Sequence, residues 1–177
     1  MAYFAALLTR SGEGWEASDI DLDDVADLDG LADLMRSATV EDQVSLLFME
    51  QEDMWFGVVR VDGEDDARVF VSDAQAAVRS AYGEILLGQL LAASDAGVAE
   101  LLDLAEPDEA QLVDEVEDEE PNSVLTGPTG DADLLSDLGL ASDQLLELVD
   151  REGMLPTEVL AEIAERAGCA EALESVR

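Results

Sequence analysis

Apolar positions in the first forty residues predict two strands followed by a helix. Residues 1–9 (MAYFAALLT) are almost continuously apolar. The turn-forming SGEG at 11–14 separates them from 15–22 (WEASDIDL), where polar and apolar residues alternate as in a more exposed strand. Leucines at helical spacing then predict a helix over 27–38, with Asp27 as its N-cap. This pattern favours a strand pair joined to a helix.

Three further strand-like runs follow in quick succession, at 44–50 (VSLLFME), 54–61 (MWFGVVRV) and 67–73 (ARVFVSD). Their connections, QED and DGEDD, are short and polar, which predicts antiparallel hairpins. Runs as apolar as SLLF and WFGVV indicate a sheet covered on both faces, or covered on one and docked on the other. Trp55 and Phe56 fall on opposite faces of their strand, so we expect at least one of them in the core.

A second helix is predicted over 74–91, capped by Ser72 or Asp73. The resulting order, β-β-α-β-β-β-α, resembles the profilin-like sandwich of longin and roadblock domains, an α+β fold with an antiparallel sheet. The resemblance concerns topology only, and a fold does not determine a function. One face of this helix is expected to consist of Val78, Ala81, Tyr82, Ile85, Leu86 and Gln89.

After Leu91 the pattern changes, because residues 106–130 are first acidic and then rich in Pro, Gly, Ser and Thr. Helical patterns resume at 131–139, 142–153 and 156–168, and each ends at a glycine. Their apolar residues are expected to form a small shared core. Its members would be Leu134, Leu135, Leu138, Leu145, Leu146, Val149, Val159, Leu160, Ile163 and Ala164.

These boundaries predict an α+β sandwich domain at 1–92, an acidic linker at 93–130 and a small C-terminal three-helix bundle at 131–177. The last segment has fewer than 50 residues, a length at which independent stability is marginal. We therefore expect its helices to dock on the N-terminal domain or on a partner.

Charge narrows the choice of partners. The chain has 44 acidic residues and 8 arginines, no lysine and no histidine, and a formal net charge of −36. Such a chain repels nucleic acid and anionic membranes, so its partners should be basic or neutral. The alternative is that the negative charge serves only solubility, in a host whose coding bias replaces lysine by arginine.

Three features of the sequence predict a cytoplasmic protein. No apolar run approaches the roughly 20 residues that cross a bilayer. The N-terminus has no basic stretch ahead of its apolar run, so no signal peptide is expected. The single cysteine, Cys169, cannot form an intrachain disulfide, which fits a reducing compartment.

The acidic stretch EPDEAQLVDEVEDEEPNS (106–123) carries nine carboxylates and no base. It contains no glycine at the turn that a calcium loop requires, so no metal site is predicted there. Two interpretations remain, a solvated tether and a surface that captures a basic partner. The candidate interaction residues are Asp114, Glu115, Glu117, Asp118, Glu119 and Glu120.

Most catalytic chemistry is excluded by composition. Without histidine and with one cysteine there is no tetrahedral zinc site, no Ser–His–Asp triad and no Cys–His pair. Without lysine there is no phosphate-binding Walker loop and no Schiff base. We therefore predict no catalytic residue, no cofactor and no enzymatic activity. The enzymatic alternative is a magnesium-dependent one that uses carboxylates such as Asp62, Asp65 and Asp66.

Several segments, in order, carry a resemblance to a known family: MAYFAALLTR with GW at 14–15, DLDDVADLDGLADLMR, LLFMEQEDMWFGVVRVDGEDDARVFVSDA, GDADLLSDLG and EGMLPTEVLAEIAERAGC. Through them the chain resembles the actinobacterial tRNA adenosine deaminase-associated proteins. The resemblance implies an association with the enzyme that converts adenosine to inosine in tRNA, and it transfers no catalytic role. The zinc signature of that deaminase, H-x-E with P-C-x-x-C, is absent from this sequence.

The leading hypothesis is a non-catalytic accessory or regulatory protein that binds a basic protein, with the tRNA adenosine deaminase as the candidate. In its sharper form, residues 106–120 cover the RNA-binding surface of the partner. The alternative is a profilin-like adaptor or homodimeric scaffold unrelated to tRNA, in which the acidic stretch is only a tether.

Overall fold

The computed structural model describes residues 3–39, 43–93 and 127–176. Its strands are β1 (Tyr3–Ser11), β2 (Gly14–Asp19), β3 (Val44–Gln51), β4 (Trp55–Asp62), β5 (Arg68–Val71) and β6 (Thr129–Gly130). Its helices are α1 (Leu28–Ala38), α2 (Ala74–Ala77), α3 (Ala81–Ala93), the 3-10 helix η2 (Ser136–Leu138), α5 (Ser142–Val149), α6 (Pro156–Ala167) and α7 (Ala170–Ser175).

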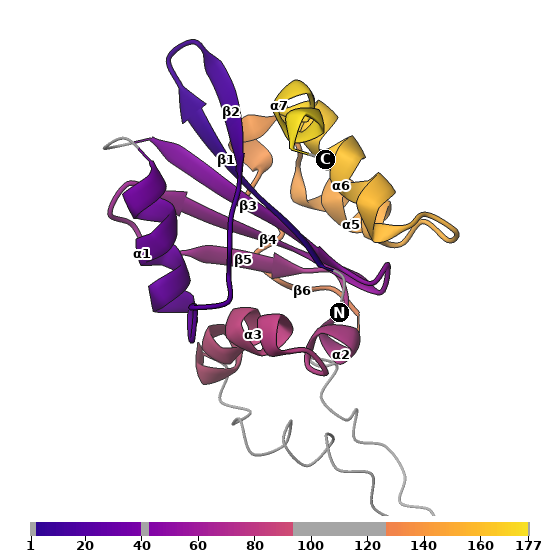
Figure 1. The fold of residues 1–177 in the computed structure, drawn as a ribbon. Helices are drawn as coiled ribbons and strands as arrows, with labels where there is room; N and C mark the ends of the chain where they lie inside the picture. Colours follow the sequence, from indigo (N-terminus) through magenta and orange to yellow (C-terminus); the bar gives the residue numbers. More distant parts are fainter. Residues whose placement is uncertain (1–2, 40–42, 94–126, 177) are drawn as a thin grey trace, which may run out of the picture.

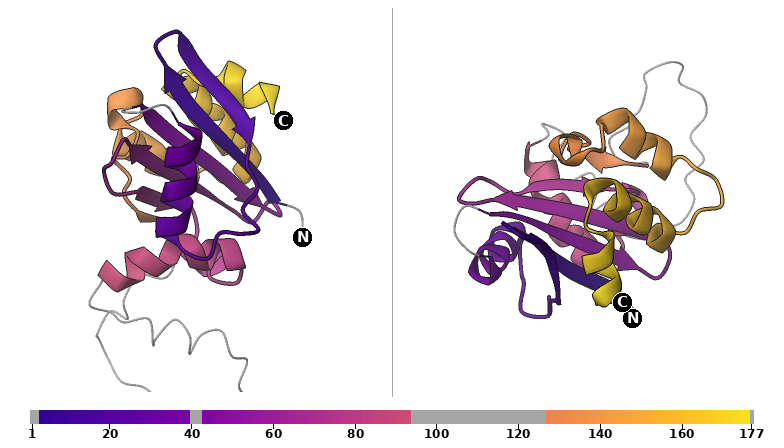
Figure 2. Two further views of the ribbon diagram at one scale, coloured as in Figure 1. Left: turned by 60° about the vertical axis from the view of Figure 1, so that its left-hand side comes forward. Right: turned by 90° about the horizontal axis from the view of Figure 1, so that it is seen from above.

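The six strands form one sheet in the order β2-β1-β3-β4-β5-β6, and every neighbouring pair is antiparallel. This confirms the α+β class and the antiparallel sheet. Helices α1, α2 and α3 lie on one side of the sheet, and α5, α6 and α7 lie on the other (Figure 1). The two further views in Figure 2 show the same three layers.

Continuous apolar runs in the central strands follow from burial on both sides. Successive residues of a strand point to opposite faces, so a strand covered on both faces needs apolar residues at every position. Leu46 and Leu47 of β3 are each 0% exposed, and they belong to different cores. Trp55 lies in the core under α1–α3 and Phe56 in the core under α5–α7, so both aromatic residues are core residues.

The first core lies between the sheet and α1–α3. Asp27 caps α1, as expected, by accepting a hydrogen bond from the Gly30 backbone N–H at 2.8 Å. Leu31 and Met35, one turn apart, are 1% and 0% exposed and point to the sheet. Asp73 likewise caps α2, by accepting from the Ala76 backbone N–H.

The single helix predicted over 74–91 is in fact two helices, α2 and α3, separated at Val78–Ser80. Ser80 starts the second helix, because its Oγ accepts a hydrogen bond from the Gly83 backbone N–H at 3.0 Å. The break brings α3 so close to α2 that a Cβ on Gly83 would lie 1.9 Å from the Ala77 carbonyl oxygen. The buried face shifts accordingly: Ala81 is exposed, and Leu87, which the helical pattern did not select, is buried.

The second core is built by the C-terminal segment on the opposite face. Residues 127–131 enter beside β5, where Gly130 is the register partner of Phe70 and the Asp131 N–H donates to the Val69 carbonyl oxygen at 2.8 Å. Leu160 and Ile163 of α6 are 0% exposed and share a core with Phe48 of β3. The core expected for the C-terminal helices is therefore continuous with the sheet.

Three details of the C-terminal segment differ from expectation. The helix predicted over 142–153 ends at Val149, with Asp150 as its C-cap, and does not reach Gly153. Residues 131–139 form turns and η2 instead of an α-helix. Leu146, expected in the core, is 41% exposed on α5. The division into 1–92, 93–130 and 131–177 stays a prediction, with the observation that Thr129–Gly130, from the linker range, pairs with β5.

Candidate functional site

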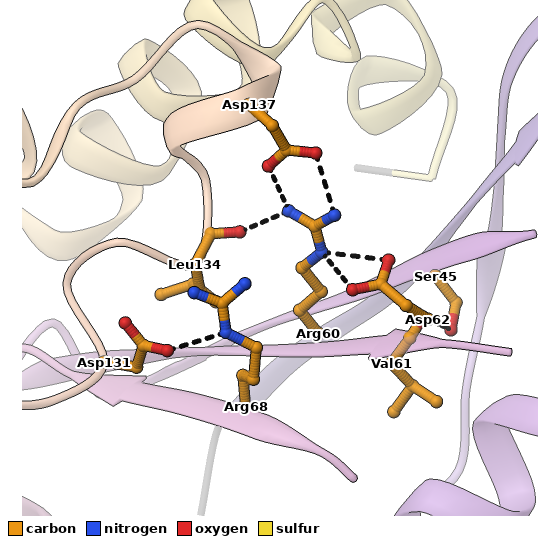
Figure 3. Close-up of polar contacts among 8 residues, drawn as sticks. All are labelled: Ser45, Arg60, Val61, Asp62, Arg68, Asp131, Leu134 and Asp137. Atoms are coloured by element: carbon orange, nitrogen blue, oxygen red, sulfur yellow. Dashed lines mark hydrogen bonds and ion pairs between the residues drawn. The ribbon is translucent and has the colours of Figure 1, made fainter. Parts of the chain in front are cut away.

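Arg60 of β4 is a buried cation, with its side chain 7% exposed. Its Nε donates hydrogen bonds to both carboxylate oxygens of Asp62, at 3.0 and 2.8 Å. Its Nη1 donates to the Leu134 carbonyl oxygen, and its two Nη atoms together bind the carboxylate of Asp137 (Figure 3). Such a two-pronged pair is the geometry in which an arginine binds a carboxylate most strongly.

Arg68 of β5 makes a similar ion pair, with Asp131. It is the register partner of Arg60, and its Nε donates to Asp131 Oδ2 at 2.6 Å. The two guanidinium groups lower the pKa of the carboxyls that they bind: Arg68 lowers that of Asp131 and Arg60 lowers that of Asp137. Two neighbouring arginines of the sheet thus attach residues 131–137 to β4 and β5.

These groups satisfy one another, which is typical of a structural ion-pair network. The largest effect on Arg60 is its hydrogen bond with Asp137, which raises the arginine pKa and keeps the group cationic. We call Arg60, Arg68, Asp131 and Asp137 the arginine clamp. Its evident role is to hold the C-terminal segment on the sheet.

The carboxylates considered for a magnesium-dependent enzyme lie near the turn between β4 and β5. Asp62 is engaged by Arg60, and the carbonyl oxygen of Asp65 accepts a hydrogen bond from Arg36 Nη2 at 2.8 Å. Within the described ranges, no group of three or more His, Cys, Asp or Glu residues is arranged to hold a metal ion. An arginine bound at this turn opposes a divalent cation there.

Cys169 lies between α6 and α7 and is 1% exposed. Burial raises the pKa of its thiol to about 12, so the residue stays a neutral thiol at physiological pH. Cys169 is thus a small residue of the core under α5–α7.

A groove of about 550 Å³ separates α3 from the segment that leads into α1. The two helices lie on the same side of the sheet (Figure 1). On one wall are residues 25–29, and the other wall is formed by α3. We call it the α1/α3 groove; it is lined by Val25, Ala26, Asp27, Leu28, Asp29, Ala81, Glu84, Ile85 and Gly88.

Contacts beside the α1/α3 groove hold its two walls together. The Tyr82 hydroxyl of α3 donates to Asp23 Oδ1 at 3.2 Å, just before α1. The same ring packs on Tyr3 of β1, with centroids 4.5 Å apart. The groove is therefore bounded by elements that are anchored to each other and to the sheet.

The acidic residues predicted to contact a partner, Asp114, Glu115, Glu117, Asp118, Glu119 and Glu120, lie outside the described residues, so that prediction remains open. The pattern of the sequence did not identify the α1/α3 groove. Gly88, inside a helical pattern, was an available signal, because a glycine in a helix interior costs about 1 kcal/mol relative to alanine.

Among the described helices, none has both the length and the apolar character needed to cross a membrane. Comparisons with curated proteins and with solved structures gave no match. The model of one family, described as Rv3753c-like tRNA adenosine deaminase-associated protein, matches residues 3–170. Since this match spans nearly the whole chain, including every described strand and the arginine clamp, the protein belongs to the Rv3753c-like tRNA adenosine deaminase-associated protein family.

Proposed function

We propose that the protein is a non-catalytic accessory protein of the cytoplasm that binds a basic protein partner, the tRNA adenosine deaminase. The family match over residues 3–170 is the observation that carries this proposal. An accessory role also agrees with a composition that lacks histidine and lysine, the side chains on which much catalysis depends.

The distribution of charge supports a basic partner. Arginines 36, 60, 68, 151 and 166 are all in ion pairs with carboxylates of the same chain. Five of the eight arginines are thus already engaged within the protein, and most of the 44 acidic residues have no arginine to neutralise them. A field of this sign attracts a protein with a basic surface and accelerates their encounter.

In the sharper form of the proposal, Asp114, Glu115, Glu117, Asp118, Glu119 and Glu120 bind the surface with which the deaminase holds tRNA. A surface that binds tRNA is basic, since it must neutralise phosphates. The accessory protein would then compete with tRNA for the deaminase and would not bind nucleic acid itself.

The test is a binding titration between the purified protein and the deaminase of the same organism at low and high salt. We expect tight binding at an ionic strength of about 0.05 M and marked weakening at about 0.5 M, because salt screens exposed charges. A deaminase that does not bind at low salt would contradict the proposal.

A variant of equal length isolates the acidic segment. Replacing the six candidate acids by their amides, Asn for Asp and Gln for Glu, removes six charges and keeps side-chain size. Weaker deaminase binding and loss of competition with tRNA are expected. Unchanged binding would make residues 106–123 a tether, as in the adaptor alternative, and would leave the accessory role itself standing.

A further inference from the structure

The α1/α3 groove combines apolar walls with an acidic rim. Leu28 is buried, and Val25 and Ile85 are partly buried at its walls. The carboxylates of Asp27, Asp29 and Glu84 are exposed around it, and no arginine lines it. A side chain that filled this groove would find apolar contacts inside and negative charge at the edge.

Charge alone does not distinguish a binding site here, because each of the three acids also has a local role. Asp27 is the N-cap of α1, Asp29 lies in its first turn, and Glu84 lies in the first turn of α3. Acidic residues at these positions stabilise helices by complementing the helix dipole.

Gly88 is a second feature of the groove, independent of its charge. It lies in the interior of the 13-residue helix α3 and is exposed. A glycine at such a position costs about 0.5–1 kcal/mol relative to alanine. A Cβ added there would meet no atom within 4 Å, so packing in this chain does not require the glycine. Gly83 in the same helix is the contrast, because a Cβ there would collide with the Ala77 backbone.

The missing side chain of Gly88 instead keeps the groove open along α3. The exposed residues Ala81, Glu84 and Gly88 follow one another at spacings of three and four, so they form a single helix face, and all three line the groove. Small residues at both ends of this face let another backbone approach α3 closely.

From this combination we infer that the α1/α3 groove binds a basic amphipathic helix of a partner protein. Its apolar side chains would lie against Val25, Leu28 and Ile85, and its lysines or arginines would face Asp27, Asp29 and Glu84. Such helix-in-groove recognition relies on anchors spaced one turn apart. The inference rests on the proposed function, since it assigns the basic partner a place on this protein.

Charge selects this occupant over the others. Residues 94–126 of the same chain carry acids and no base, and a second copy of the protein is equally acidic, so each would be repelled from the rim. Nucleic acid is excluded for the same reason.

The first experiment needs no deaminase. Its probe is a fluorescein-labelled 18-residue synthetic peptide with leucines on one helical face and lysines on its flanks. The proteins are wild type, Gly88→Leu and Gln75→Leu. Leucine favours a helix and a Cβ at position 88 meets no atom within 4 Å, so Gly88→Leu should fold as stably as wild type, which circular dichroism and thermal melting verify. Gln75, exposed on α2 outside the groove, is the matched control.

We expect Gly88→Leu to bind the peptide at least about tenfold more weakly than wild type, with Gln75→Leu unchanged, since one filled anchor pocket removes a large share of such binding. Equal binding by all three proteins would mean attraction by charge alone and would overturn the inference. A peptide with glutamine in place of lysine that binds as well as the basic one would overturn it too. So would a dimer of wild type that Gly88→Leu abolishes in sedimentation, because the occupant would then be a second copy.

The same three proteins are then titrated with the deaminase. A tenfold loss confined to Gly88→Leu would place the partner in the groove. Equal binding by all three would overturn the groove as the docking site and leave the proposed function intact. Absence of binding by wild type, with the peptide still bound in the groove, would refute the deaminase as partner but retain a basic helix as occupant.

Discussion

The two faces of the sheet are covered in different ways. Helices α1, α2 and α3 come from segments directly next to the strands, whereas α5, α6 and α7 arrive after the long acidic stretch and cover the far side (Figure 1). Each face also has an arginine that ties a helix or turn to the sheet. Arg60 on the C-terminal side is 7% exposed and binds carboxylates, while Arg36 of α1 is 32% exposed and reaches backbone carbonyls in the β4–β5 turn.

This difference separates a face that holds the fold from a face that has room for a partner. The arginine clamp closes the C-terminal side with partly buried ion pairs. The opposite side keeps the α1/α3 groove between α1 and α3.

The largest effect is expected from Phe48→Ala in the second core. Phe48 is 0% exposed and packs with α5–α7, so its removal leaves a large cavity. The free energy of unfolding should fall by about 3–5 kcal/mol, measured by chemical denaturation. Hydrogen exchange should show loss of protection in α6 before α1, and equal loss in both helices would contradict a separation between the faces.

Arg60→Ala should come next, with a loss of about 3 kcal/mol, because Asp62, Asp137 and the Leu134 carbonyl oxygen lose a buried partner. The matched control is Arg36→Ala on the other face, where a more exposed arginine should cost no more than about 1 kcal/mol. Denaturation of both variants measures the difference. Similar losses would show that the two arginines are equivalent and that the clamp is not special.

Asp137→Asn should cost about 1–2 kcal/mol at pH 7, because a charged hydrogen bond becomes a neutral one and the carboxylate is half exposed. The pKa of Asp137 is lowered in the folded state, so its contribution is present above the unfolded value of about 4 and is lost as pH falls through the lower, folded value. The variant should therefore lose less stability than wild type below about pH 4. Thermal melts at pH 7 and pH 3 measure this, with Asp143→Asn as an exposed control. Parallel curves for Asp137→Asn and wild type would exclude a role for the ion pair.

The smallest effect should have the opposite sign. Gly88→Ala is expected to raise the free energy of unfolding by about 0.5–1 kcal/mol, because alanine is the better helix former and its Cβ has free space. Gly83→Ala in the same helix should destabilise, since its Cβ would collide with the Ala77 carbonyl. Chemical denaturation of both variants measures their free energies of unfolding. A Gly88→Ala variant less stable than wild type would mean that the fold itself requires the glycine.

Local signals predicted many of the element boundaries and the burial of the central strands. Asp27 and Asp73 cap helices as expected, and Gly139 and Gly168 end helical segments with positive φ of 102° and 79°. The uninterrupted apolar runs of the central strands indicated burial on both faces, and Trp55 and Phe56 confirm it from opposite sides. These features depend on neighbours a few residues away, which is the range over which periodicity and capping act.

The α1/α3 groove could not be predicted from such local signals. The acidic run drew attention to residues 114–120, but the groove is built from a helix start and from α3, which the sequence separates by more than fifty residues. Its signal, Gly88, has meaning only beside Gly83, because the clash at one position and the free space at the other depend on where α2 lies.

By itself, then, the sequence determined the first five strands, the helix caps Asp27 and Asp73, the excess of negative charge and the family. Only the tertiary structure decided that the C-terminal helices cover the second face and that the helix of 74–91 breaks at residues 78–80. It also decided that Arg60 binds Leu134 and Asp137, which lie 74 and 77 positions further along the chain. The physical reason is range. Hydrophobic periodicity and capping act within a few residues, whereas ion pairs, close backbone approaches and grooves arise where distant segments are brought together by burial of apolar surface.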